Sequence, residues 1–147
     1  MTLEMQTTLI NFSVNTSLDE LAMVRNTISE QLVKFPLTEI EINQIVLSVD
    51  EICANLVLHA EKKKLADSIE ISLIKEENGI RVNILDHCIS YNPITNKENS
   101  IDALIKERKK GGIGLILVNR IMDNIEYRIE GTYNICSLFK RMKFEVA

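Results

Sequence analysis

The sequence predicts a two-layer α/β (α+β) sandwich, in which a mostly antiparallel, mixed sheet carries its helices on one face. Short runs of alternating apolar and polar residues, typical of half-buried strands, are interspersed with longer runs in which apolar residues recur at helical spacing. Two consecutive pairs of strand-like runs are joined by glycine-containing turns, which predicts hairpins and therefore antiparallel neighbours. The expected order over the 147 residues is strand, helix, helix, strand, strand, lid, helix, strand, strand, in one domain.

The first strand and the first helix are predicted near the N-terminus. Residues 3–14 alternate apolar and polar side chains, which indicates an edge strand. Ser17 and Glu20 have the spacing of a capping box, in which each side chain accepts a hydrogen bond from the other residue's backbone N–H. Pro36 ends the helix, whose apolar stripe is Leu21, Val24, Ile28, Leu32 and Phe35.

A second helix carries an unusual polar stripe. Thr38 and Glu41 fit another capping box, and the apolar spacing extends the helix to about His59. Glu51, Asn55 and His59 recur every fourth residue, so they form one stripe about 12 Å long beside an apolar face. A carboxylate and an amide at such a boundary are costly to bury unless something pairs with them. Taken alone, the stripe is consistent with an ordinary polar helix edge as well as with a functional site.

The middle of the chain predicts a hairpin that ends in a carboxylate. Alternating runs at 69–73 and 80–84 flank Asn78 and Gly79, a pair that is the strongest short signal for a hairpin turn. Asp86 follows the second run directly and, taken alone, is an ordinary residue at a strand end.

The rest of the chain predicts a lid, a third helix and a second hairpin. Residues 87–110 show no strong period, and long loops in compact domains are commonly functional lids. Glycines at 111, 112 and 114 open a helix that extends to about Met122, and two alternating strands then turn at Gly131 and Thr132. Glycines at a helix start let a phosphate approach the free backbone N–H groups. A single motif of this kind is also typical of a tight turn.

Composition and charge exclude several classes of protein. Apolar residues make up 46% and charged residues 26% of the chain, so disorder is excluded as its main state. The net charge of −4 argues against broad nucleic-acid binding, which needs a basic surface. No apolar run is long enough for a membrane span and the N-terminus lacks the pattern of a signal peptide, so we expect a cytoplasmic protein. The cysteines at 53, 88 and 136 are too widely spaced for a metal motif, and we expect reduced thiols.

Together, three motifs carry a family resemblance. Residues 51–60 read Glu-x3-Asn-x3-His-Ala on a predicted helix, Asp86 ends a predicted strand, and residues 112–123 open with Gly-Ile-Gly-Leu at a helix start. In this order they resemble the GHKL ATPase superfamily, which has the Bergerat ATP-binding fold. Within it, the chain is most similar to the small anti-sigma-factor serine/threonine kinases of bacterial partner-switching systems, over essentially its whole length.

The resemblance implies a role for each motif residue. By this similarity, Glu51 is the general base and so the catalytic residue, and Asn55 holds Mg²⁺ against the phosphates of ATP. Asp86 accepts a hydrogen bond from the adenine amino group, and the backbone N–H groups at Gly112 and Gly114 bind the phosphates. ATP and Mg²⁺ are therefore the implied cofactors.

The resemblance also implies a domain, partners and an assembly. Residues 1–147 are expected to form one histidine-kinase-like ATPase domain with an ATP lid at about 94–111. The implied function is an ATP-dependent protein serine/threonine kinase that acts as an anti-sigma factor and phosphorylates a STAS-type anti-anti-sigma protein. A sigma factor is the second expected partner, and a homodimer the expected assembly. Arg25 on the first helix is the candidate contact for a protein partner, with a plain solvated arginine as the alternative.

Two other functions stay open at this point. The family's first glycine box has two glycines, and both are replaced here, by Cys88 and Ser90. That loop favours a nucleotide-binding regulatory module that sequesters a sigma factor or another regulator with little or no turnover, whereas the retained Glu51 favours a kinase. A GHKL ATPase outside sigma-factor control is the third interpretation.

Overall fold

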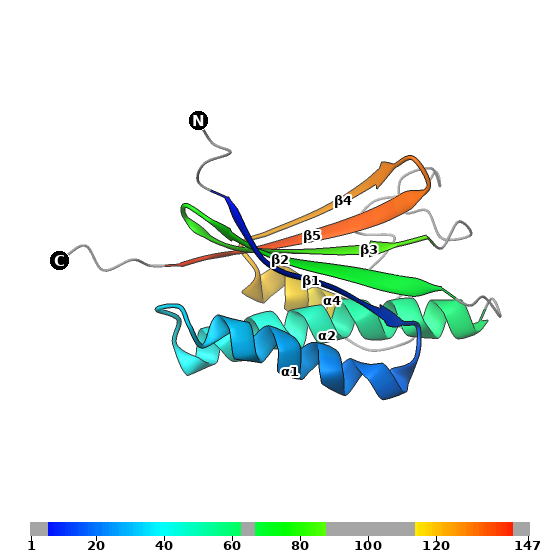
Figure 1. Cartoon of the computed structure of the whole chain (residues 1–147), viewed down its shortest axis with the longest axis horizontal. Helices are drawn as coiled ribbons and strands as arrows, with labels where there is room; N and C mark the ends of the chain where they lie inside the picture. Colours follow the sequence, from blue (N-terminus) through cyan, green and yellow to red (C-terminus); the bar gives the residue numbers. More distant parts are fainter. Residues whose placement is uncertain (1–5, 63–66, 88–113, 143–147) are drawn as a thin grey trace.

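The computed structural model describes residues 6–62, 67–87 and 114–142 of the chain. Its elements follow the predicted order and form a sheet and a layer of helices (Figure 1). The strands are β1 (Thr7–Asn15), β2 (Ser68–Glu76), β3 (Gly79–Asp86), β4 (Asn124–Glu130) and β5 (Tyr133–Arg141). The helices are the short 3₁₀ helix η2 (Leu18–Glu20), α1 (Leu21–Leu32), α2 (Glu39–Lys62) and α4 (Gly114–Ile121). The predicted lid, Gly112, Cys88 and Ser90 lie outside the described residues.

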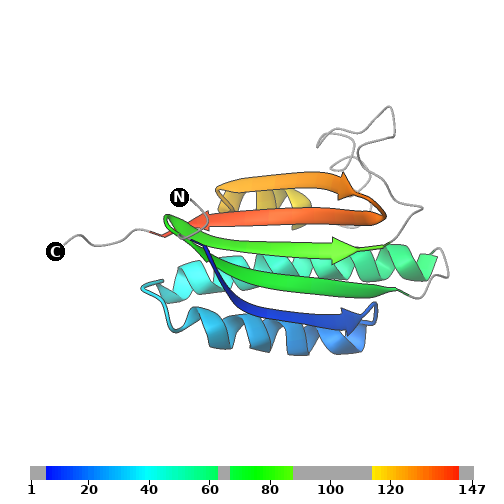
Figure 2. The ribbon, with the colours of Figure 1, turned by 45° about the horizontal axis from the view of Figure 1, so that its top comes forward.

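The sheet has the strand order β1-β2-β3-β5-β4, and each neighbouring pair is antiparallel. β1 lies at one edge, as predicted, and the described helices all cover one face of the sheet (Figure 2). The predicted two-layer sandwich with helices on one face is therefore confirmed, and the described sheet is wholly antiparallel where a mostly antiparallel, mixed sheet was predicted. β4 runs in the same direction as β3, but β5 lies between them, so no parallel pair forms among the described strands. No helix in these ranges is both long and apolar enough to cross a membrane.

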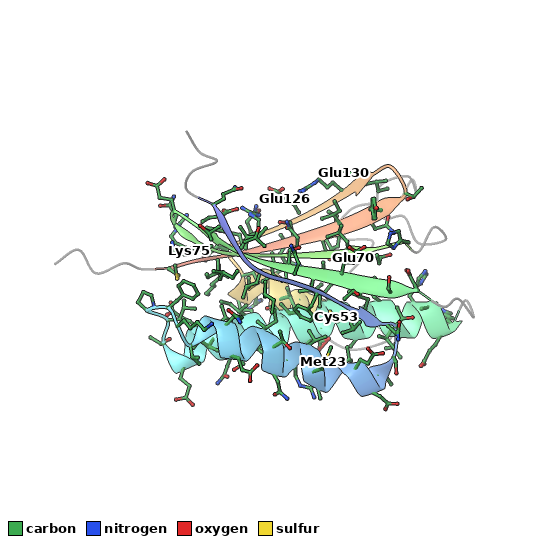
Figure 3. All side chains as sticks on the ribbon, viewed as in Figure 1. Met23, Cys53, Glu70, Lys75, Glu126 and Glu130 are labelled. Atoms are coloured by element: carbon green, nitrogen blue, oxygen red, sulfur yellow. The ribbon has the colours of Figure 1, made fainter. Side chains whose placement is uncertain are left out.

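A hydrophobic core fills the space between the sheet and the helices (Figure 3). α2 lies between α1 and α4 and contacts both. Alternate residues of the central strands point to this side, where they meet one apolar stripe of each long helix. Each such side chain contributes about 1.5–3 kcal/mol by leaving water. Fully buried members of the core are Val24, Ile28, Leu32, Ile45, Val49, Ile71, Val82, Ile84 and Leu138.

Two cysteines belong to this core. Cys53 on α2 and Cys136 on β5 are buried free thiols. Burial and, to a lesser extent, the negative charge of Asp50 raise the pKa of the Cys53 thiol well above its ordinary value. Cys53 therefore stays protonated and packs as a small apolar side chain.

The two predicted capping boxes have different outcomes. At the start of α2, the Thr38 backbone N–H donates to Glu41 Oε1 (2.8 Å) and the Glu41 N–H donates to Thr38 Oγ1 (3.0 Å), so this box is confirmed. Before α1, the Ser17 backbone N–H instead donates to the carbonyl oxygen of Asn15 at 2.7 Å. Glu20 Oε1 accepts from the backbone N–H of Asn15, at 3.2 Å. Ser17 still caps η2, because its Oγ accepts from the Asp19 backbone N–H at 3.3 Å, but the predicted reciprocal box with Glu20 is wrong because the turn before η2 already uses the Ser17 N–H.

The β2–β3 hairpin forms where it was predicted, but its turn is placed one residue earlier. The loop residues are Glu77 and Asn78, and Gly79 is the first residue of β3. A Cβ atom at Gly79 would lie 2.2 Å from the Lys140 carbonyl oxygen and 2.7 Å from the Phe139 ring. Glycine is therefore required there by the close approach of β5, and not by the turn.

The second hairpin turns at Gly131 and Thr132, as predicted. Gly131 has a φ of 62°, in the left-handed region that side chains disfavour. In this hairpin the glycine does serve the turn.

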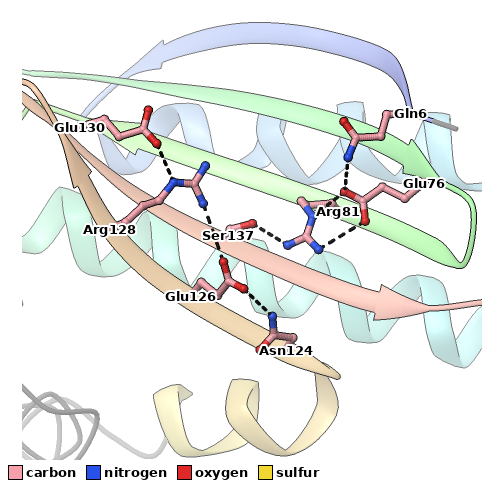
Figure 4. A network of polar contacts seen from close by, with 8 residues as sticks. All are labelled: Gln6, Glu76, Arg81, Asn124, Glu126, Arg128, Glu130 and Ser137. Atoms are coloured by element: carbon pink, nitrogen blue, oxygen red, sulfur yellow. Dashed lines mark hydrogen bonds and ion pairs between the residues drawn. The ribbon is translucent and has the colours of Figure 1, made fainter. Parts of the chain in front are cut away.

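The sheet face away from the helices carries polar side chains held by ion pairs and hydrogen bonds (Figure 4). Arg81 on β3 donates to both carboxylate oxygens of Glu76 on β2, at 2.6 and 3.3 Å, and to Ser137 Oγ on β5, at 2.9 Å. The guanidinium also lies over the Phe139 ring, 5.0 Å from its centroid. These contacts join three neighbouring strands on the face opposite the helices.

Candidate active site

The predicted polar stripe lies on α2. Glu51, Asn55 and His59 follow one another at intervals of one helical turn, and all three are half-buried. Within the described part of the chain, neither the Glu51 carboxylate nor the Asn55 amide makes a hydrogen bond or ion pair with another residue. α2 runs for 24 residues from its Thr38 cap, so the stripe is carried by a rigid element. A carboxylate and an amide oxygen are therefore available to a ligand on this helix.

Arg25 has a partner inside the protein. Its Nη1 lies 2.8 Å from Asp50 Oδ1, so the side chain links α1 to α2 at the residue before Glu51. The Arg25 side chain is still 44% exposed. The ion pair with Asp50 decides neither alternative, so the predicted contact with another protein and a solvated arginine without a partner protein both stay open.

Asp86 occupies the end of β3 with 5% of its surface exposed. Asn134 lies directly opposite on β5, and its Nδ2 donates to Asp86 Oδ1 at 3.1 Å. A buried carboxylate is stable only where its oxygens are hydrogen-bonded, so Asn134 reduces the cost of placing Asp86 here. Sequence reasoning identified Asp86 and missed Asn134, because the two are 48 residues apart and only the strand register brings them together.

Asp67 fixes the chain on the other side of Asp86. Its Oδ2 accepts from the backbone N–H of His87 at 3.0 Å, and its Oδ1 accepts from the backbone N–H of Ser68 at 2.7 Å. The His87 ring also packs against Tyr133, with 4.6 Å between ring centroids. These contacts hold the strand end, and with it the position of Asp86, although no pattern in the sequence pointed to Asp67.

Gly114, a predicted phosphate-binding residue, lies in α4. α4 spans Gly114–Ile121, where a helix from Leu115 to about Met122 was predicted, and it packs against α2. Free N–H groups at a helix start attract phosphate groups.

The chemistry of these residues fits an adenine nucleotide with Mg²⁺. The buried Asp86 carboxylate suits a base amino group, and the Asn55 amide oxygen is a ligand of the type that Mg²⁺ prefers. α2 and α4 lie on the same side of the sheet, and α2 contacts both α4 and β3 (Figure 1). Gly112 belongs to a part of the chain outside the described ranges, and its role stays a prediction.

A known family matches most of the chain. The model of the histidine kinase-like ATPase domain matches residues 14–140. The serine-protein kinase RsbW of Bacillus mycoides (strain KBAB4) is 23% identical over 121 residues, which cover 80% of this chain and 75% of the relative. The serine-protein kinase RsbW of Bacillus cereus (strain AH820) is 24% identical with the same coverage.

Solved structures share the fold at low identity. The SiaB–SiaC complex from Pseudomonas aeruginosa matches with a TM-score of 0.65 and 14% identity, over 90% of this chain and 89% of that chain. The RsbU and RsbW domains of Rv1364c from Mycobacterium tuberculosis match with a TM-score of 0.63 and 14% identity, over 90% of this chain but only 31% of that longer one. The resemblance to the GHKL superfamily is confirmed, and the chain belongs to the histidine kinase-like ATPase domain family.

Proposed function

We propose that this protein is an ATP- and Mg²⁺-dependent protein serine/threonine kinase. It acts as an anti-sigma factor and phosphorylates a STAS-type anti-anti-sigma protein. The observation that carries the proposal is the pair Glu51 and Asn55, half-buried one turn apart on α2 with no partner among the described residues. Two further facts support it: relatives are named serine-protein kinase RsbW, and a structure with this fold is a complex of SiaB with a second protein.

Each end of the nucleotide has its own residues in this proposal. Asp86 accepts a hydrogen bond from the adenine amino group, and Asn55 holds Mg²⁺ through its amide oxygen. The backbone N–H groups at Gly112 and Gly114 bind phosphate oxygens. When bound, Mg²⁺ would neutralise part of the negative charge of the ATP phosphates.

Glu51 acts on the partner's serine. It accepts the proton of the serine hydroxyl while the serine oxygen forms a bond to the γ-phosphorus. The bond from that phosphorus to the bridging oxygen breaks, and ADP leaves. Half-burial on a long helix supports this role for Glu51, because its backbone is fixed and its carboxylate has no partner among the described residues.

The domain and assembly belong to the same proposal. Residues 1–147 form one ATPase domain whose ATP lid lies at about 94–111, and the protein works as a homodimer. A second candidate function is a binding module that sequesters a sigma factor with little turnover. Its support is the replacement of the two glycines of the first glycine box by Cys88 and Ser90.

Phosphotransfer from labelled ATP to a purified STAS partner tests the proposal. Glu51→Gln preserves shape and removes the proton acceptor, so we expect ATP binding to persist and transfer to fall about 100-fold or more. Glu61→Gln is the matched control, because Glu61 is an exposed glutamate on the same helix, and it should transfer like the wild type. Undiminished transfer by Glu51→Gln excludes Glu51 as the base. Wild-type protein that binds ATP and a partner without transfer supports the binding module.

A further inference from the structure

We propose that Asn134 is the positioning residue for the base-binding carboxylate, and that its hydrogen bond to Asp86 sets the preference for adenine over guanine nucleotides. This inference rests on the proposed nucleotide site, because Asp86 must face the base for Asn134 to act through it. Asn134 has no role in the motifs that the sequence offered.

The strand register distinguishes Asp86 and Asn134 from the apolar pairs beside them. On the helix-covered side, β3 and β5 are joined by facing residues, first Val82 with Leu138 and then Ile84 with Cys136. The next facing pair is Asp86 with Asn134, at the end of the same ladder. Both apolar pairs are buried, and Asp86 is 5% exposed. Asp86 and Asn134 therefore differ from the apolar pairs before them, because a buried carboxylate is hydrogen-bonded to the amide opposite it.

The chemistry of the two side chains fixes which atoms meet. An ionised carboxylate only accepts hydrogen bonds, so the Asn134 amide must turn its NH₂ group toward Asp86. The distance from Nδ2 to Oδ1 is 3.1 Å, which is an ordinary hydrogen bond. A donor to the charged form favours that form, so the hydrogen bond from Asn134 favours the ionised carboxylate and fixes its orientation. An ionised Asp86 attracts the amino group at C6 of adenine and repels the carbonyl at the same position of guanine.

Other titratable groups surround this strand end. His87 follows Asp86, and its ring lies 3.6 Å from Asp67 Oδ1 and 4.0 Å from Glu70 Oε2. On β2, the residue paired with Asp86 is the apolar Ile69. α2, which packs against β3, carries His59 in its last turns. Because these groups are common to wild type and variants, the effect of Asn134 is read from the difference between their pH profiles.

The test measures the Kd of ATP and of GTP from about pH 8 down to about pH 3.5, a range that includes the ordinary pKa of an aspartate, about 3.9. Asn134→Leu keeps the approximate volume and removes the donor. We expect ATP binding to weaken about tenfold. We also expect the pH at which acidification abolishes half of the ATP binding to rise by about one unit, because a tenfold loss of preference for the ionised carboxylate corresponds to one pKa unit. The preference for ATP over GTP should also shrink, because a protonated carboxyl group donates to the guanine carbonyl. Asn134→Asp, which keeps the size and polarity, should move the acid limb further, since facing carboxylates share a proton.

Ser137→Ala is the matched control. Ser137 lies on the same strand but faces the other side of the sheet, where it accepts a hydrogen bond from Arg81. Its loss should lower the melting temperature without changing the pH profile or the ATP preference. If Asn134→Leu and Asn134→Asp behave like this control, Asn134 is only structural and the inference is overturned. If the wild type binds neither nucleotide, the proposed function fails and the inference falls with it. If Asn134→Leu does not fold, Asn134→Asp decides the question.

Discussion

Asn55 carries an amide oxygen one turn after Glu51 on the polar stripe of α2. Asn55→Ala removes this oxygen, so we expect ATP to bind the variant equally well with and without Mg²⁺. The wild type should bind ATP at least about tenfold more tightly with Mg²⁺ than without it. Even residues that only hydrogen-bond to a metal ligand change metal affinity by factors of about 10 to 100, and Asn55 is proposed as a ligand itself. Calorimetric titration in Mg²⁺ and in a chelator measures both affinities. Asn43→Ala, an exposed asparagine on the same helix, is the control that should match the wild type.

The prediction about Asn55 can also be tested on the wild type alone. Equal ATP affinity with and without Mg²⁺ in the unmodified protein removes any role for Asn55 in holding the metal. A Mg²⁺ dependence that survives in Asn55→Ala assigns the metal to another oxygen.

The residues of the site differ in how far sequence could predict them. Helical spacing places Glu51 and Asn55 on one stripe, because both positions lie on one element, whereas their roles come from the family resemblance. The alternating run before Asp86 places it at a strand end, and its role too comes from the family resemblance. Asn134 and Asp67 act on the same strand end, but their contacts depend on which strands pair and in which register. That information is non-local, so no short window of sequence contains it.

At the scale of the element, the cap at the N-terminus of α2 stabilises the helix that carries Glu51 and Asn55. Thr38→Ala removes the hydroxyl that accepts from the Glu41 N–H, so we expect a loss of about 1 kcal/mol in the free energy of unfolding. Urea unfolding should show a lower midpoint with an unchanged m-value. ATP affinity should persist, because Glu51 lies more than three turns further along α2.

A threonine within a helix provides the matched control. Thr27 lies inside α1, where alanine is the better helix former, so Thr27→Ala should be neutral or slightly stabilising. Equal destabilisation by Thr38→Ala and Thr27→Ala contradicts a specific contribution of the cap.

Glycine shows why element boundaries were predicted less well than the elements. Asn78 and Gly79 indicated a hairpin correctly, but the loop lies one residue earlier, because Gly79 is needed where β5 passes close to it. Gly131 fulfils the expected role, with a positive φ in its turn. The sequence cannot separate these two uses of glycine, since the atoms that require Gly79 belong to Phe139 and Lys140, far along the chain.

At the scale of the whole molecule, Arg25 links α1 to α2 and is also the predicted contact for a partner protein. Its ion pair with Asp50 links the helices beside Glu51, while its exposed portion is accessible to another protein. An exposed pair contributes about 0.2–1 kcal/mol, so the fold does not depend on it. The prediction that Arg25 contacts a partner therefore has to be separated from its link to Asp50.

Arg25→Glu should weaken binding of the STAS partner about 30-fold, since an interface arginine can contribute about 2 kcal/mol. It should also lower the stability of the protein by about 1 kcal/mol or less, because the new carboxylate faces Asp50 in place of an attractive charge. Asp50→Asn breaks the same ion pair but leaves the Arg25 cation, so partner binding should persist in this control. Calorimetric titration of the partner into each variant gives the affinities. If both variants lose the partner equally, Arg25 acts by holding α1 against α2. If Arg25→Glu binds like the wild type, the contact lies elsewhere on the molecule.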